Sequence, residues 1–80
     1  MENEDQIGVW YRDTETNTHY LPINMDEAWA VWLTPGGDYA MTLHDDRVGH
    51  GEDVEYFDNL RKAKREAEKR YKSGYRPEYL

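Results

Sequence analysis

The 80-residue sequence contains no cysteine and only one serine, and both shortages limit the chemistry that it can perform. Without cysteine, the protein has neither a disulfide framework nor a thiolate nucleophile, which is compatible with a reducing cytoplasm. The single serine, Ser73, ends a helix-forming stretch and has no neighbouring base that could activate it. We therefore predict that the protein is not an enzyme.

The sequence also lacks a long apolar run. The longest is Ala28–Leu33, whereas a membrane-spanning helix needs about 20 apolar residues. The first residues are acidic, where a secretory signal would be basic and then apolar. We therefore expect a cytoplasmic protein that is neither secreted nor inserted into a membrane.

Recognisable metal and nucleotide motifs are missing as well. One segment is rich in side chains that can bind metals: His44, Asp45, Asp46, His50, Glu52 and Asp53. Their spacing matches neither the paired ligands of a zinc site nor the alternating carboxylates of a calcium loop. The pair Gly36 and Gly37 follows a proline and suits a turn, not a phosphate-binding loop. We predict a solvated acidic loop, with no metal and no cofactor.

Aromatic residues are abundant in spite of the low hydrophobic fraction of 38%. Three Trp, seven Tyr and one Phe supply large apolar areas, so we expect a folded chain. A chain of this length suits one domain that buries about 60% of the surface of its unfolded form. We predict a single domain over residues 1–80, with residues 1–6 as a disordered acidic tail.

The clearest local pattern is a helix over residues 58–73. Its apolar residues recur at spacings of three and four: Leu60, Ala63, Ala67 and Tyr71. Asp58 is a candidate N-cap, because its carboxylate can accept from free backbone N–H groups. Gly74 can take the left-handed conformation that ends a helix. Residues 75–80 then form a tail that is apolar enough to dock or to bind.

The segment before this helix alternates like strands. Residues 7–12 alternate with period two like a half-buried strand, with Ile7, Val9 and Tyr11 on one face and Gly8, Trp10 and Arg12 on the other. Residues 13–17 suit a turn, and residues 18–21 suit a returning strand that Pro22 ends. This arrangement predicts a first hairpin. Residues 54–57 suit a short edge strand that leads into the helix.

Residues 28–33 can be a strand or a helix by their apolar pattern alone. We favour the strand because Thr34–Asp38 has the residues of a three-residue hairpin turn, with Gly37 as its left-handed position. That turn predicts three apolar pairs on one face: Leu33 with Tyr39, Val31 with Met41, and Trp29 with Leu43. The fold class expected is α+β, an antiparallel β-meander of four to five short strands (residues 7–57) with one C-terminal helix packed on one face.

The combination of paired strands, a Gly-Gly turn and an Asp-capped helix rich in Ala, Lys and Glu is similar to many small phage or mobile-element proteins. The likeness lies in general character, and it carries no specific family motif.

Charge is distributed unevenly along the chain. Residues 1–58 hold fourteen Asp and Glu against two Arg, a net charge of −12, whereas residues 59–80 hold eight Lys and Arg against three Glu, a net charge of +5. Because the screening length in cells is about 8 Å, the two parts can act on different partners. The acidic part of one copy could also contact the basic helix of another.

The sequence supports two functional hypotheses, and a third, a small enzyme or metal protein built on the loop from His44 to Asp53, is the least favoured. In the first, the sheet face away from the helix carries Trp10, Trp32, Ala40, Thr42 and His44, with Tyr20 as a further candidate. These aromatic residues either pack against the tail residues Tyr75, Pro77 and Tyr79 or anchor a protein interface. We favour a non-enzymatic interaction protein that binds and modulates a basic protein partner, with DNA mimicry by an inhibitor as a special case. Its expected binding residues are Trp10, Trp32, His44, Asp45, Asp46, Glu52 and Asp53.

In the second hypothesis, the outer face of the helix binds nucleic acid. At 100° per residue, five cations share that face: Arg61, Lys62, Arg65, Lys69 and Lys72. The overall pI of about 4.8 and the absence of a known reading motif count against this hypothesis. A basic helix face can also serve solubility alone.

Overall fold

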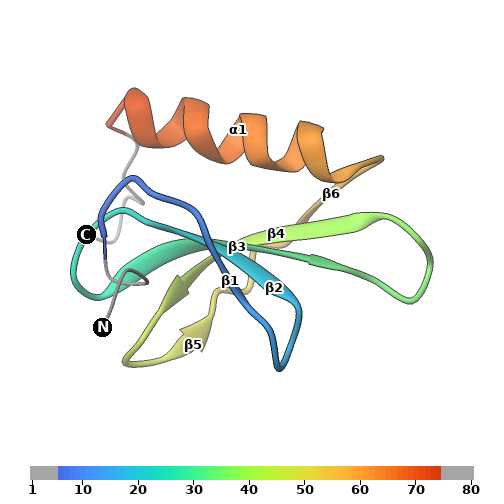
Figure 1. Ribbon diagram of the computed structural model, residues 1–80, viewed down its shortest axis with the longest axis horizontal. Helices are drawn as coiled ribbons and strands as arrows, with labels where there is room; N and C mark the ends of the chain where they lie inside the picture. Colours follow the sequence, from blue (N-terminus) through green and yellow to red (C-terminus); the bar gives the residue numbers. More distant parts are fainter. Residues whose placement is uncertain (1–5, 75–80) are drawn as a thin grey trace.

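The computed structural model describes residues 6–74, which form an antiparallel sheet with one helix lying across one of its faces (Figure 1). Within these residues there are six strands and one helix: β1 (Tyr11–Asp13), β2 (Thr18–Pro22), β3 (Glu27–Leu33), β4 (Tyr39–Asp45), β5 (Gly49–His50), β6 (Glu55–Phe57) and α1 (Leu60–Lys72). The strands β1 to β4 lie side by side in chain order, and β5 and β6 both pair with the other edge of β4. The α+β meander predicted from the sequence is confirmed.

The hairpin of β3 and β4 forms the centre of the sheet. Its register pairs Leu33 with Tyr39, Val31 with Met41, and Trp29 with Leu43, as the turn chemistry predicts. Gly37 takes the left-handed conformation, with φ of +97°. Residues 28–33 are therefore a strand, and the helical alternative is wrong. β3 pairs with β4 along its whole length and with β2 from Ala28 to Val31, so its central backbone is paired on both sides.

One hydrophobic core lies between the helix and the sheet. Its buried members are Leu21, Trp29, Val31 and Met41 from the sheet and Ala63 and Ala67 from the helix. The two alanines are small, so the helix can approach the sheet closely. At the margin of this core, the Arg70 guanidinium lies 5.3 Å from the centre of the Trp29 ring. It also binds the Glu55 carboxylate, with Nη1 2.6 Å from Oε2, and thereby ties the helix to β6.

Both helix ends follow sequence signals, but the start is one residue later than predicted. The N-cap is Asn59, whose Oδ1 accepts from the Lys62 backbone N–H at 2.9 Å. Asp58, the predicted cap, instead lies 3.4 Å from the Lys62 ammonium. Gly74 is left-handed as predicted, with φ of +75°. Among residues 6–74, no helix is long and apolar enough to cross a membrane.

The edge of the sheet beside β4 is broken into two short strands. β5 was not predicted, because a strand of two residues, one of them glycine, shows no period. Between β5 and β6 the chain bulges away from β4, and the hydroxyl of Thr42 donates to the carbonyl oxygens of Gly51 and Asp53 at 3.3 and 3.1 Å. This buried threonine takes part in holding the loop against the sheet where backbone pairing stops.

The first strand begins later than predicted, at Tyr11 in place of residue 7. Gly8 interrupts the extended chain with φ of +84°, and its N–H donates to the carbonyl of Pro22 at 2.8 Å. A Cβ at this position would lie 2.8 Å from the Tyr71 hydroxyl, so the segment passes close to the helix. The expected tails, residues 1–6 and 75–80, lie outside the described residues except for Gln6, and so do Tyr75, Pro77 and Tyr79.

Candidate interaction surface

The sheet face opposite the helix carries a continuous series of five aromatic rings. Neighbouring ring centres are 5.3 Å apart for Tyr11 and Tyr20, 5.7 Å for Tyr20 and His44, 4.8 Å for His44 and His50, and 4.9 Å for His50 and Trp32. All four spacings fall in the range of about 4.5–7 Å that is favourable for aromatic pairs. We call these five residues the aromatic arc.

The arc gathers on one face because strand residues alternate between faces and the register aligns them. Tyr20 pairs with Tyr11 on one side and Ala30 on the other, and Ala30 pairs with Thr42. Three small residues of β3 and β4 share this face with the rings, and each is at most 1% exposed: Ala30, Ala40 and Thr42. Small side chains there leave room for the larger rings to lean over them. Of the five residues of the arc, His50 is exposed and the other four are half-buried.

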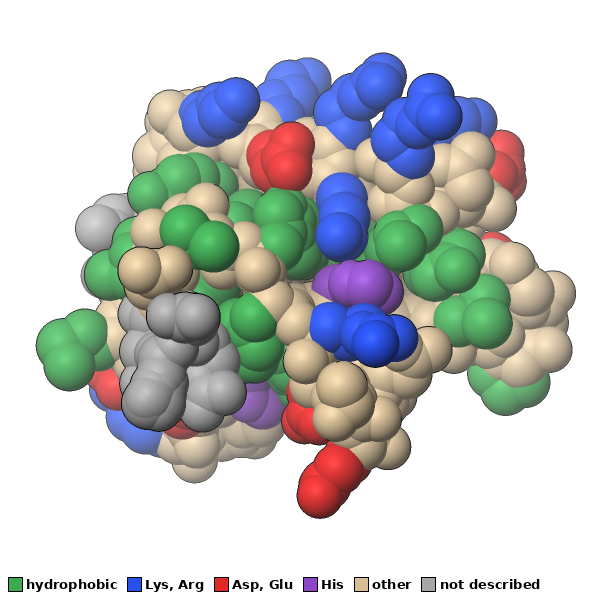
Figure 2. All heavy atoms as spheres, viewed as in Figure 1, with side chains coloured by type: hydrophobic (Ala, Val, Ile, Leu, Met, Phe, Trp, Pro, Cys, Tyr) green, Lys and Arg blue, Asp and Glu red, His purple; other side chains and the backbone are tan. Residues whose placement is uncertain are grey.

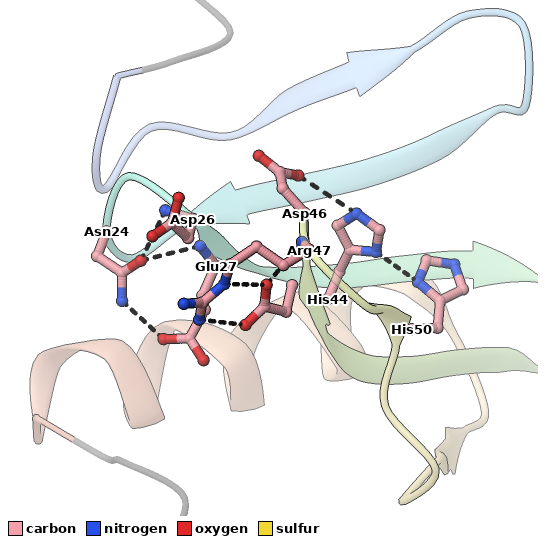
Figure 3. A network of polar contacts seen from close by, with 8 residues as sticks. Asn24, Asp26, Glu27, His44, Asp46, Arg47 and His50 are labelled. Carbon is pink, nitrogen blue, oxygen red and sulfur yellow. Dashed lines mark hydrogen bonds and ion pairs between the residues drawn. The ribbon is translucent and has the colours of Figure 1, made fainter. Parts of the chain in front are cut away.

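Two histidines join the middle of the arc through a direct hydrogen bond. Nδ1 of His44 lies 2.9 Å from Nδ1 of His50, so one of these nitrogens donates and the other accepts. On its other side, Nε2 of His44 lies 3.5 Å from the Asp46 carboxylate, and Figure 3 shows the three residues in a row. Burial, with the neighbouring His44 as a smaller cause, lowers the pKa of His50. The hydrogen bond requires at least one neutral imidazole.

The acidic residue next to this row is not available for binding. Asp45 is 6% exposed and accepts from the backbone N–H of Arg47 at 2.8 Å and from its guanidinium at 3.0 and 2.8 Å. These hydrogen bonds lower the pKa of Asp45 to about 2. Because Asp45 pairs with Glu27 at the end of β3, it belongs to the opposite face from His44. The predicted role of Asp45 in a binding surface does not fit this position.

Glu27 completes the polar network at this end of the sheet (Figure 3). Its Oε1 accepts from the Asn24 side chain at 2.7 Å, and the Asn24 Oδ1 accepts from the backbone N–H of Asp26 and of Glu27, each at 2.9 Å. Glu27 is 5% exposed, and its Oε2 has no hydrogen-bond partner among the described residues. The hydrogen bond to Asp45, with Asp26 and Glu27 as smaller causes, raises the pKa of Arg47, so the positive charge of Arg47 acts on Glu27 as well.

A hollow of about 390 Å³ adjoins the Tyr11 end of the arc. We call it the acidic hollow, because its lining among residues 6–74 includes four acidic residues and neither Lys nor Arg: Asp13, Asp26, Glu27 and Asp46. Tyr11, Tyr20 and His44 supply aromatic walls, and the side chain of Ala28 is small. Burial, followed by Asp13 and Asp46 as smaller causes, raises the pKa of Tyr20.

Trp10 does not lie on the open face, contrary to the prediction. It packs against the core on the helix side, and its indole Nε1 donates to the Glu68 carboxylate at 2.8 Å. The Lys64 ammonium lies 4.9 Å from the centre of its ring. Trp10 precedes β1, and its hydrogen bond and cation contact give it a structural role against the helix.

Of the other residues predicted to bind a partner, only some lie together on the arc. Trp32, His44 and Asp46 meet around the arc, as described above. Glu52 and Asp53 are exposed in the loop after β5, where they line a separate hollow of about 450 Å³ together with His50. They therefore lie near the His50 side of the arc and not in the acidic hollow.

Sequence reasoning missed two members of the arc, Tyr11 and His50. Tyr11 was assigned to the core face because the alternation in residues 7–12 was read with the opposite parity. His50 lies in a segment interpreted as a loop, and its contact with His44 depends on a two-residue strand. The pairing of two tyrosines across the first hairpin was the available signal for Tyr11.

The second candidate surface is the outer face of the helix. Its five predicted cations are all exposed: Arg61, Lys62, Arg65, Lys69 and Lys72. Figure 2 shows Lys and Arg side chains gathered along the top of the molecule, where Figure 1 places the helix. We call these five residues the basic ridge. Lys64 on the helix and Arg12, the cross-strand neighbour of His19, add positive charge on the helix side of the sheet, and after burial they are the smaller causes that lower the pKa of His19. The acidic and basic surfaces thus lie on opposite sides of the sheet.

Among residues 6–74, no three His, Asp or Glu side chains are arranged to hold a metal ion. Ser73 lies at the C-cap of the helix, where its hydroxyl donates to the carbonyl of Arg70 at 3.0 Å. The chemistry that the open face offers is ring stacking, hydrogen bonding and attraction of positive charge.

A comparison with known protein families found no model that matches the chain, and comparisons with curated proteins and solved structures found no match.

Proposed function

We propose that the protein is a non-enzymatic interaction protein that docks a basic protein partner on its open sheet face. The observation that carries this proposal is the aromatic arc, in which five rings contact one another in series, two pairs stacked and two pairs edge to face, on the sheet face opposite the helix. Aromatic side chains are enriched at the centres of protein interfaces, where they contribute most of the binding free energy.

The charges around the arc favour a basic partner. The acidic hollow adjoins the arc at Tyr11, and Glu52 and Asp53 lie in the loop beside His50. These carboxylates would repel a phosphate backbone and attract Lys and Arg side chains. Binding would cover the basic surface of the partner, and this is how the protein would modulate it in the cytoplasm. DNA mimicry, or a role as a phage accessory protein, would be a special case that no specific contact favours.

The proposal is tested by calorimetric titration of the protein with a synthetic peptide of alternating glycine and arginine. Trp32→Ala removes one end of the arc, and we expect Kd to rise more than about tenfold, as for a hot-spot truncation. Leu33→Ala is the matched control, because Leu33 is the next residue of β3, points to the other face and is 50% exposed. We expect Leu33→Ala to leave Kd unchanged, and equal effects of the two substitutions would refute the proposal.

Nucleic-acid binding by the basic ridge is the second candidate, and the full exposure of its five cations favours it. Five phosphate contacts would give a slope of about −4 to −5 in a log–log plot of affinity against salt. A titration with mixed-sequence duplex DNA at two salt concentrations tests this candidate, with Lys69→Glu as the charge-reversing variant. Binding that weakens with salt and is lost in Lys69→Glu would support it, and a lack of binding would exclude it.

A further inference from the structure

Residues 49–53, which contain β5, lie against β4 without any buried side chain. We call them the β5 segment. Its backbone pairs with the end of β4, the Gly51 N–H donates to the carbonyl of Leu43 at 2.9 Å, and the Thr42 hydroxyl donates to the carbonyls of Gly51 and Asp53. A segment that buries few apolar groups opens at a lower free energy than the core does. The loss of one further hydrogen bond can therefore release it.

The side-chain link between this segment and β4 is the hydrogen bond between His44 and His50, whose Nδ1 atoms lie 2.9 Å apart. Such a bond needs one Nδ1–H as donor and one bare Nδ1 as acceptor. A neutral pair supplies both, and so does a pair with one extra proton, because the imidazolium donates to the neutral ring. With two extra protons both Nδ1 atoms carry hydrogen, so the acceptor is lost and two like charges face each other.

Titratable and charged groups surround the pair on several elements. Asp46 lies 3.5 Å from Nε2 of His44, and Tyr20, whose pKa is raised, contacts the His44 ring from β2. Burial, and then the charge of His44, lowers the pKa of His50. The neighbouring carboxylates favour a first proton on the pair, whereas the direct contact between the rings opposes a second. The other groups line the two hollows beside the pair: Tyr11, Asp13, Asp26 and Glu27 on the His44 side, and Glu52, Asp53, Glu55 and Arg70 on the His50 side.

We propose that the hydrogen bond between His44 and His50 is a pH-sensitive latch, which holds the β5 segment on β4 while at least one imidazole is neutral and releases it when both are protonated. The two protons bind in coupled steps that belong to the pair. Since the pKa of His50 is lowered from its ordinary value of 6.5, the second proton binds below that pH. The pKa of Asp45 is about 2, so its bonds to Arg47 persist in this range and keep the turn before β5 in place.

Release of the β5 segment would regulate the docking face, and this consequence rests on the proposed function. A protonated His50 is still attracted to the Trp32 ring, so the arc breaks between His44 and His50. The new positive charges on the open face also repel a basic partner. Docking is therefore stronger at neutral pH than in acid.

The experiment follows the nitrogen-15-labelled full chain by nuclear magnetic resonance from pH 7.5 to pH 4.5. Ring nitrogen shifts report the protonation of His44 and His50, and backbone order parameters report the motion of the β5 segment. At pH 7.5 we expect order parameters of about 0.85 at Gly49, His50 and Gly51, as in β4, and values below about 0.6 once both rings are protonated. A segment that stays as ordered as β4 after both rings are protonated would overturn the proposal.

Asparagine variants separate the latch from other effects of acid, because asparagine places a neutral amide near the position of Nδ1. In His44→Asn, and separately in His50→Asn, two positive charges cannot face each other, so we expect the β5 segment to stay ordered over the whole pH range. His19→Asn is the matched control: His19 precedes Tyr20 in β2 and therefore lies on the other face of the sheet. We expect it to keep the response of the unaltered chain. The same loosening in His44→Asn or His50→Asn as in the unaltered chain would overturn the proposal.

Titration with the glycine–arginine peptide at pH 7.5 and 5.0 separates this inference from the proposed function. If both hold, Kd should rise about tenfold at the lower pH in the unaltered chain and less than about threefold in His50→Asn. If the segment loosens but the peptide binds independently of Trp32, the latch stands and the docking proposal fails. If the peptide binds through Trp32 but the segment stays ordered in acid, the docking face stands and the latch fails.

Discussion

Gly8 provides a sharp test of the contact between the N-terminal segment and the helix. Its φ of +84° lies in the left-handed region, and an added Cβ would meet Tyr71 Oη at 2.8 Å and Cζ at 3.2 Å. Gly37 is the matched control, because its φ of +97° is similar and no atom lies within 4 Å of its added Cβ. Alanine therefore introduces the same backbone strain at both positions, but a steric conflict only at Gly8.

The magnitudes follow from these two terms. A left-handed L-residue costs roughly 1–2 kcal/mol, and the loss of glycine entropy in the unfolded chain offsets about 0.4–1 kcal/mol of that cost. We expect Gly37→Ala to lower the free energy of unfolding by about 1 kcal/mol. For Gly8→Ala the Tyr71 ring must also move from its place against the core, which adds about 1–3 kcal/mol.

Urea denaturation, followed by circular dichroism, measures both free energies of unfolding. Tyr71→Phe removes the hydroxyl that makes the 2.8 Å contact, so the extra cost of Gly8→Ala should become smaller in this background. Equal costs for Gly8→Ala and Gly37→Ala would refute the close approach of Gly8 to Tyr71 of the helix. They would also refute the path by which the chain before β1 passes the helix and enters the sheet.

Three further predictions concern the helix cap, the core and pH. Replacing Asn59 by Ala should lower the free energy of unfolding, measured by urea denaturation, by about 1 kcal/mol. Asp58→Ala should change it by less than about 0.5 kcal/mol. A larger loss for Asp58→Ala than for Asn59→Ala would show that Asp58 is the cap. Met41 is fully buried, so Met41→Ala should cost about 2–5 kcal/mol by the same assay, and a cost below that range would contradict its place in the core. The pKa of His50 is lowered in the folded state, so the unfolded chain binds a proton at His50 more readily than the folded chain does. As the pH falls below the His50 pKa of the unfolded chain, about 6.5, the free energy of unfolding therefore decreases. Thermal unfolding at several pH values should show this decline, and His50→Gln should reduce it; an unchanged decline would show that His50 is not its source.

The central hairpin could be predicted because two independent signals agreed there. The turn at Thr34–Asp38 set a register, and that register placed Leu33, Val31 and Trp29 opposite apolar residues. In the helix, spacing and stop signal likewise agreed, and only the cap was displaced by one residue, within the usual variation of helix ends. Where local chemistry and hydrophobic period point the same way, the fold follows from the sequence.

The open face was harder to predict because the side chains of a strand alternate between its two faces, and a one-residue error in that alternation moves all of them to the wrong face. Ile7 and Val9 are apolar and suggested the inward positions, yet they are 49% and 48% exposed. Gly8 breaks the strand between them, so the alternation restarts at Tyr11. A shift by one residue exchanges the faces. Trp10 was therefore placed on the open face in error, and Tyr11 was left out of it.

The contact between His44 and His50 had no local signal at all. It depends on the two-residue strand β5, which pairs with the end of β4 after a turn of charged residues and glycine. Such a short pairing is fixed by tertiary contacts and not by the period of its own residues. The same holds for the acidic hollow, whose lining comes from several separate segments of the chain.

The most direct test of the docking face uses the three tryptophan indoles as reporters in one spectrum. Trp32 lies on the arc, Trp29 is 4% exposed in the core, and Trp10 lies beneath Lys64 on the helix side. Proton–nitrogen correlation spectra of the labelled protein follow all three indole N–H groups while the glycine–arginine peptide is added. The account predicts that the Trp32 signal shifts in a saturable manner and that the Trp10 and Trp29 signals stay in place. A shift of Trp10 with Trp32 unchanged would contradict it, because the partner would then bind on the helix side of the sheet.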